Sequence, residues 1–170
     1  LWLSYSKVEI CDSINEISHD IIAKVLKKYK IENGIEIHSI SEVSGGSGLG
    51  SSGTFTVGLL HLLNTMFKKD MTRKELAEEA AYTEMVELKR HCGKQDQYIA
   101  SYGGIVAMHI DHEGGVVVKD LNLDKTILIT LKNNLHIYHI GFSRDANTIL
   151  KEQNTKLKKK QQVPTAGMKH

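Results

Sequence analysis

The first hydrophobic pattern along the chain has the period of an α-helix. Apolar residues recur every three or four positions between residues 14 and 29, a spacing that gathers side chains on one helix face. Ser13 and Glu16 form a candidate capping box where the pattern begins, and Gly34 follows where it ends. We predict one amphipathic helix with an inner face of Ile14, Ile17, Ile21, Ile22, Val25, Leu26 and Tyr29.

A short alternating pattern and a strongly apolar segment follow. Ile35 and Ile37 alternate with Glu36 and His38, which indicates a half-buried strand. Residues 55–67 leave almost no polar face, so we predict a helix that is buried centrally. Between the two lies the glycine- and serine-rich sequence VSGGSGLGSSG.

The next helix has its own start signal. Thr72 and Glu75 form a second candidate capping box. The segment GKQDQYIASYGG, residues 93–104, is bounded by glycines and is interpreted as irregular. The predicted inner side of the helix consists of Leu76, Ala77, Ala80, Met85 and Leu88.

Strand-like runs dominate the last third of the chain. The runs GIVAMHI and VVVKDL flank a DHEGG turn, as the strands of a hairpin do. KTILITL and NLHIYHIG are interpreted as two further strands, before a last helix near Ser143. Because helices and strands do not alternate strictly, the order favours an α+β fold.

Composition restricts the class of protein. With 170 residues, 41% of them hydrophobic, the chain is expected to form a globular domain with a core. No apolar run is long enough to cross a bilayer and the first residues lack signal-peptide features, so we expect a cytoplasmic protein that does not bind membranes. Cys11 and Cys92 form no CxxC motif, which argues against a disulfide scaffold or a zinc module.

Charge and histidine content suggest no further site. The net charge is +2, and residues 156–160 (KLKKK) form its one concentrated basic run, so nucleic-acid binding is weakly supported. In strand-like runs, the odd spacings of His109 with His112 and of His136 with His139 place each pair on opposite faces. We therefore do not expect a metal site built from histidines.

The glycine-rich segment has the composition of an anion-binding loop. Glycines allow positive φ and a close approach of backbone N–H groups to a ligand, and a helix N-terminus favours negative charge. Ser51 and Ser52 add hydroxyls that suit a phosphate oxygen or a magnesium ion. Phosphate is the predicted ligand.

Two common phosphate loops fit poorly. A Walker A loop needs a lysine before its Ser/Thr, and GLGSSG has none. Gly48, Gly50 and Gly53 satisfy GxGxxG, but a dinucleotide fold also needs a strand with a terminal acidic residue after the helix. Here KKDMTRKELAEEAA opens another helix instead.

A third loop type fits well. SGGSGLGSSG resembles the P-x-x-x-G-L-G-S-S-A loop of the GHMP small-molecule kinases. With the helix bearing Glu84, then GKQDQYIASYGG and GFSRDANTILKEQ, the chain is similar over most of residues 4–153 to the branch that phosphorylates D-glycero-D-manno-heptose 7-phosphate. The resemblance implies transfer of the ATP γ-phosphoryl group to the anomeric hydroxyl. It also implies the family's ribosomal-protein-S5-like α+β domain with a left-handed βαβ unit.

The resemblance assigns roles to particular residues. Ser52 and Glu84 would bind Mg²⁺, with Glu87 as the alternative to Glu84, and Asp96 would face the acceptor hydroxyl as general base or orienting group. The competing interpretation of the two glutamates is that they lie on a solvated helix surface. The competing interpretation of Asp96 is that it caps a turn. The residues implied to cradle the triphosphate are Gly46, Ser47, Gly48, Leu49, Gly50, Ser51 and Ser52.

Sugar-binding roles follow in the same way. The implied donors to the sugar hydroxyls are Lys94, Gln95 and Gln97, while Gly103 and Gly104 would let the next strand pass close by. Arg144 is the candidate partner for the sugar phosphate. The competing interpretation is that Arg144 is an ordinary surface residue at a helix start.

The chain also departs from the family pattern. Ser44 replaces the usual proline and Gly53 the usual alanine or serine, and both changes are expected to loosen the loop. We interpret residues 1–155 as the ATP-binding N-terminal domain without its first strands, and residues 156–170 as a basic linker into a C-terminal domain. The expected partners are ATP and a phosphorylated sugar, with a homodimer left open. The alternatives are another sugar 1-kinase of the fucokinase type, or a non-catalytic nucleotide-binding module.

Overall fold

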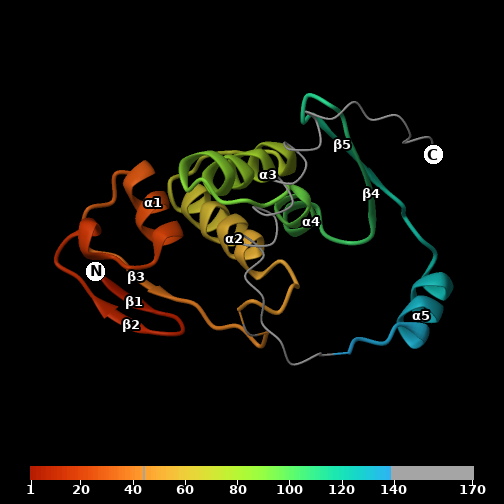
Figure 1. The fold of residues 1–170 in the computed structure, drawn as a ribbon, viewed down its shortest axis with the longest axis horizontal. Coiled ribbons are helices and arrows are strands. Elements are labelled where there is room, and N and C mark those ends of the chain that lie inside the picture. Colours follow the sequence, from red (N-terminus) through yellow and green to blue (C-terminus); the bar gives the residue numbers. More distant parts are fainter. Residues whose placement is uncertain (44, 139–170) are drawn as a thin grey trace, which may run out of the picture.

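Helices form the centre of the molecule, with a small sheet at one end and a hairpin at the other (Figure 1). The structure is a computed structural model and describes residues 1–43 and 45–138. The predicted α+β class is confirmed, since helices and two antiparallel or mixed sheets occur in irregular order.

The N-terminal sheet has three strands in the order β2-β1-β3. Strand β1 (Trp2–Ser4) pairs antiparallel with β2 (Val8–Ile10) and parallel with β3 (Glu36–His38). We predicted only β3, because three-residue strands give almost no alternation to detect. The parallel pair β1 and β3 is joined through a helix, as in a βαβ unit, and the left hand of that crossover stays a prediction.

The predicted first helix is two helices. A 3₁₀ turn, η1 (Ile14–Glu16), is followed by an extended Ile17 and then by α1 (Asp20–Lys28). The break arises because side chains take the backbone N–H groups: that of Ser18 donates to Glu9, and that of Ile22 donates to His19 Nδ1. The prediction of one continuous helix was therefore wrong at residues 17–19.

Three helical segments follow the glycine-rich loop. They are α2 (Ser51–Met66), α3 (Arg73–Tyr82) and η2 (Thr83–Glu87), the last a single π-helical turn. The capping box of Thr72 and Glu75 is confirmed, with both reciprocal hydrogen bonds present.

The segment predicted as irregular is largely helical. Helix α4 (Gln95–Tyr102) occupies most of residues 93–104 and packs against both α2 and α3. The interpretation was wrong because this short helix buries a glutamine and a tyrosine, Gln97 and Tyr98, so its inner face is not apolar in sequence.

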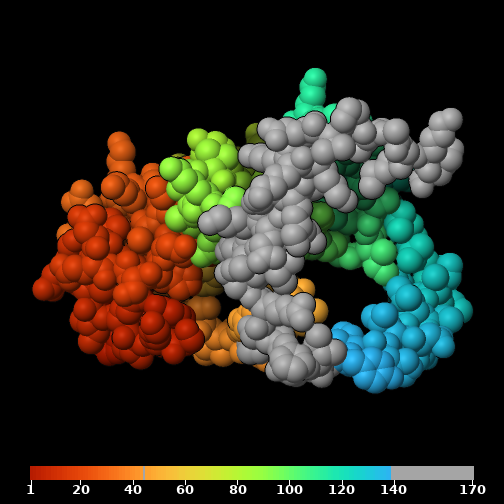
Figure 2. Space-filling model, viewed as in Figure 1, coloured from red at the N-terminus to blue at the C-terminus, as the bar shows by residue number. Residues whose placement is uncertain are grey.

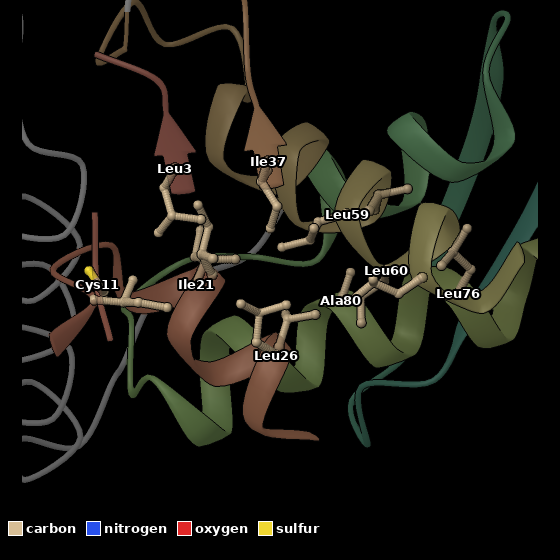
Figure 3. Close-up of a cluster of buried hydrophobic side chains, with 14 residues drawn as sticks. Leu3, Cys11, Ile21, Leu26, Ile37, Leu59, Leu60, Leu76 and Ala80 are labelled. Atoms are coloured by element: carbon tan, nitrogen blue, oxygen red, sulfur yellow. The ribbon is translucent and has the colours of Figure 1, made fainter. Parts of the chain in front are cut away.

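The main core lies where α1, α2 and α3 meet below the three-stranded sheet (Figure 3). Leu26, Leu60 and Ala80 come from the three helices and are fully buried, and Leu3 and Ile37 cover them from the sheet. Burying a leucine or isoleucine contributes about 1.5–3 kcal/mol. The prediction that α2 is central is confirmed, although Leu62 and Met66 near its end and the C-cap Phe67 are exposed.

In the C-terminal part of the described chain, one predicted element is confirmed and the prediction of another is wrong. Strands β4 (Val106–Ile110) and β5 (Val116–Asp120) form the predicted hairpin. The run KTILITL is a helix, α5 (Lys125–Asn134), because Asp124 caps its N-terminus through the N–H of Thr126. Within the described residues α5 packs against no other helix or strand, and it lies at the periphery in Figure 2.

Several predictions fall wholly or partly outside the described residues. Residues 135–138 form no strand, whereas the rest of NLHIYHIG, His139, the helix near Ser143, Arg144 and the run 156–160 are not covered. Among the helices that the structure describes, none has the length and apolar character to span a membrane.

Candidate functional site

The glycine-rich loop adopts a conformation that other residues rarely accept. Gly46, Gly48 and Gly50 have φ of +75°, +79° and +70°. A Cβ at Gly48 would meet open space, so the backbone angle rather than crowding favours glycine there. Left-handed residues at alternate positions turn successive backbone N–H groups toward one side, which is the geometry of an anion-binding concavity.

The loop ends at an uncapped helix N-terminus. Gly50 is the N-cap of α2 and provides no side-chain hydrogen bond, and the first turn of α2 carries no acidic residue. The first N–H groups of a helix lack intrahelical partners, and the helix dipole adds a partial positive charge. This end of α2 is therefore suited to a phosphate group.

Ser52 and Glu84 come together beside the helix start. The Ser52 hydroxyl donates a hydrogen bond to Glu84 Oε2, and the Gln97 amide donates to Oε1 at 2.8 Å. Glu84 is only 2% exposed, so it is not a solvated surface carboxylate. Among the two predicted glutamates, Glu84 is the one that contacts Ser52.

A π-helical turn directs Glu84 inward. Glu84 lies in η2, where the backbone is wider than in an α-helix, and such turns are frequent at functional sites. The Arg90 N–H donates to the Glu84 carbonyl oxygen at 2.9 Å and closes the turn. The hydrophobic pattern of the sequence does not predict this change from an α-helix to a π-helix.

Arg90 joins the site and was missed by sequence reasoning. Its Nη1 lies 2.6 Å from Ser52 Oγ and 3.3 Å from Glu84 Oε2. Its Nη2 donates to both carboxylate oxygens of Asp20 on α1, at 2.7 and 2.8 Å. Ser52, Glu84 and Asp20 are 38, 6 and 70 residues away from Arg90 along the chain. The cluster is therefore visible only in the packing of the helices.

Asp96 lies at the end of the glycine-rich loop. It is exposed in the first turn of α4, and a Cβ built on Gly50 would lie 3.0 Å from Asp96 Cγ. The N-cap of α4 is Lys94, so Asp96 does not cap this helix. The carboxylate therefore lies next to Gly50, within the predicted phosphate loop.

Gly53 allows this proximity. A Cβ on Gly53 would come within 2.8 Å of Asp96 Cβ and 3.2 Å of its carbonyl carbon. We expected Gly53 to loosen the loop, but in the structure it lets α2 and α4 approach closely.

The remaining predicted sugar-binding residues have different surroundings. The Lys94 ammonium donates to Glu78 at 3.0 Å and to the Gly114 carbonyl at 2.7 Å, which ties α4 to α3 and to the hairpin turn. Gln97, predicted as a donor to a sugar hydroxyl, is buried and its amide donates to Glu84. Gln95 is exposed.

Gly103 and Gly104 follow α4 with φ of +71° and +66°. A Cβ at either position would meet nothing within 4 Å, so no close neighbour requires glycine there, and their role beside a sugar stays a prediction. These glycines are needed for the left-handed turn between α4 and β4.

Two groups near the site have shifted pKa values. Burial, with the nearby Glu84 carboxylate, raises the pKa of Cys92 to about 11, which keeps its thiol protonated and unreactive. Burial acts to raise the pKa of Glu78, but hydrogen bonds from Tyr98 and Lys94 outweigh it and hold that pKa below its usual range.

Comparison with known proteins shows the family and the fold. Residues 15–104 match the family described as GHMP kinases N terminal domain. The chain belongs to the GHMP kinase family. This domain therefore carries the glycine-rich loop, Glu84 and Asp96 on a kinase fold, and the predicted family and fold are confirmed.

Two groups of curated proteins are similar in sequence. A D-glycero-alpha-D-manno-heptose 7-phosphate kinase from Campylobacter jejuni is 30% identical over 89% of this chain and 43% of its own length. A homoserine kinase from Methanococcus maripaludis is 35% identical over 46% of this chain and 26% of its own length.

Solved structures give the same fold. A D-glycero-D-manno-heptose 1-phosphate kinase from Bacteriodes thetaiotaomicron has a TM-score of 0.68 and 22% identity, over 76% of this chain and 46% of that one. A structure titled a putative sugar kinase from Campylobacter jejuni has a TM-score of 0.59 and 26% identity, over 83% of this chain and 45% of that structure's chain. The chain thus spans less than half the length of these relatives.

Proposed function

We propose that this chain is the nucleotide-binding part of an ATP-dependent sugar kinase that phosphorylates the anomeric hydroxyl of D-glycero-D-manno-heptose 7-phosphate. The observation that carries the proposal is the convergence of three features: the left-handed glycine loop, the Ser52–Glu84 pair and the Asp96 carboxylate against Gly50. Phosphoryl transfer depends on positioning and charge neutralisation more than on covalent chemistry. The loop N–H groups and Asp96 would position the substrates, and a metal ion held by Ser52 and Glu84 would neutralise charge.

Each group has a distinct task in the proposed reaction. The backbone N–H groups of the loop and of the α2 N-terminus hold the phosphates of ATP. Asp96 accepts a hydrogen bond from the acceptor hydroxyl and orients it, or removes its proton, beside the transferred group. Gln97 keeps the Glu84 carboxylate in place through its 2.8 Å hydrogen bond.

The donor set beside α2 fits a magnesium ion. A hydroxyl and a buried carboxylate are hard oxygen ligands, and Arg90 already places a positive group on the same two oxygens. Ser52 and Glu84 would hold Mg²⁺, which would neutralise phosphate charge during transfer. Among the described residues, no three or more His, Cys, Asp or Glu side chains are grouped so that they could hold a metal ion, so water and phosphate oxygens would complete the ligand set.

Homoserine is the second candidate acceptor. The homoserine kinase from Methanococcus maripaludis shares 35% identity with this chain over 79 residues, a higher value than the heptose kinase reaches over its longer match. Both reactions transfer phosphate to a hydroxyl and can use the same loop, so the acceptor is decided outside the phosphate site.

An acceptor panel tests the proposal. ADP release is measured with Mg-ATP and heptose 7-phosphate, fucose or homoserine in turn, for this 170-residue chain and for a version extended at both ends. We expect release with heptose 7-phosphate above that with the other two. Preferential release with homoserine or fucose would overturn the proposed acceptor, and ATP binding without any release would favour the non-catalytic module.

A further inference from the structure

The Arg90 guanidinium lies where a metal ion between Ser52 and Glu84 would lie. Its Nη1 contacts Ser52 Oγ at 2.6 Å and Glu84 Oε2 at 3.3 Å, the two oxygens proposed as Mg²⁺ ligands. Two cations that share the same pair of oxygens repel each other. Arg90 and a divalent ion therefore exclude one another at this point.

The burial of Glu84 explains the need for a positive group when no metal is bound. A carboxylate that is 2% exposed is costly to keep charged unless it is paired. Ser52 and Gln97 donate hydrogen bonds but carry no charge, whereas Arg90 donates one and is always protonated.

Asp20 gives Arg90 a second position. Nη2 makes two hydrogen bonds to the Asp20 carboxylate, which is 52% exposed, while Nη1 faces the buried pair. The guanidinium fork can therefore release Ser52 and Glu84 and remain bound to Asp20. The backbone bond from Arg90 to the Glu84 carbonyl keeps the two residues adjacent throughout.

We propose that Arg90 is an internal counter-cation of the Ser52–Glu84 pair, which a divalent metal ion displaces toward Asp20, so that Arg90 sets the metal affinity of the site. The inference deepens the proposed function and rests on its assignment of Ser52 and Glu84 as metal ligands. It assigns Arg90 a positioning role rather than a catalytic one.

Metal titration tests the competition directly. Mn²⁺ binding is followed by electron paramagnetic resonance of the free ion, without nucleotide or sugar, for the wild type, Arg90→Met and Lys89→Met. Lys89→Met is the matched control, because it removes the same charge from the neighbouring exposed residue. We expect Arg90→Met to bind Mn²⁺ about tenfold more tightly than the wild type, and Lys89→Met to stay within about twofold.

Stability without metal provides a second measurement. In EDTA, the Tm of Arg90→Met is expected to lie below that of the wild type. In a Glu84→Gln background the same substitution should lower the Tm less, because no buried charge there needs a partner. If Arg90→Met does not fold, Arg90→Lys replaces it, with Mn²⁺ affinity about threefold above the wild type, because lysine lacks the fork that reaches both sites.

Unchanged or weaker Mn²⁺ binding by the Arg90 variants would overturn the inference, and so would equal Tm losses in the two backgrounds. Neither measurement uses ATP or an acceptor. A chain that fails the acceptor panel can therefore still pass this test, and the two proposals fail separately.

Discussion

The Asp96 side chain packs so closely over Gly53 that a Cβ on Gly53 would lie 2.8 Å from Asp96 Cβ. This contact brings the first turn of α4 against the start of α2, where the glycine-rich loop ends. A small residue on one helix thus determines how near the candidate catalytic carboxylate lies to the candidate phosphate site.

Gly53→Ala is expected to destabilise the protein by about 1–3 kcal/mol, because the new methyl group overlaps Asp96 and the α4 backbone. The control is Gly58→Ala in the same helix, where a Cβ meets nothing within 4 Å and alanine's helix propensity should add up to about 1 kcal/mol. Urea unfolding measures both free energies. Equal stability of the two variants would show that Gly53 is not a packing constraint.

Asp96→Asn is expected to lower turnover about 10²- to 10⁴-fold, because the amide no longer accepts the proton of the acceptor hydroxyl. Mg-ATP affinity should change little, since Asp96 adjoins the end of the loop without capping its helix. Steady-state kinetics and calorimetry separate the two effects. The control is Asp70→Asn, an exposed acid in the α2–α3 loop; loss of turnover in both variants would contradict the role of Asp96.

Glu84→Gln is expected to weaken Mg-ATP binding about tenfold or more, because a neutral amide is a poor ligand for a divalent cation. Glu87→Gln tests the other predicted glutamate, three residues away on the same π-helical turn. Calorimetric titration should leave its affinity within about twofold of the wild type. A larger effect at Glu87 than at Glu84 would reverse the assignment.

The Glu78 carboxylate is expected to stabilise the fold only above acidic pH. Its folded-state pKa lies below the ordinary value because the Tyr98 and Lys94 hydrogen bonds outweigh the effect of burial. A lowered pKa gives stability that is present above the unfolded value of about 4.3 and is lost as the pH falls through the folded value. The Tm advantage of the wild type over Glu78→Gln should therefore shrink from neutral pH toward pH of about 3. A constant or growing advantage would contradict this.

The sequence predicted what depends on local pattern. The helix start at Thr72, the hairpin after residue 104 and the loop at Gly46–Ser52 each have a short-range signal, and the first two are confirmed. KTILITL was misassigned as a strand because β-branched residues suggested one, while Asp124 supplied the helix cap that decided the outcome.

The candidate site was predictable only in part. Ser52, Glu84 and Asp96 were assigned as candidates through family resemblance. Arg90 and Asp20 have no motif, and they meet because the segment after η2 packs against α1. The close approach at Gly53 was missed for the same reason, since spacing along the chain says nothing about which helix lies opposite.

Calorimetric titration of Mg-ATP into this chain, repeated with heptose 7-phosphate present, determines whether the glycine-rich loop binds nucleotide phosphates. We expect ATP to bind and the sugar phosphate to strengthen its binding, because Asp96, proposed to orient the sugar, lies against Gly50 of the loop proposed to hold ATP. Absence of ATP binding, both in this chain and in one extended at both ends, would contradict the assignment of the glycine-rich loop to phosphate.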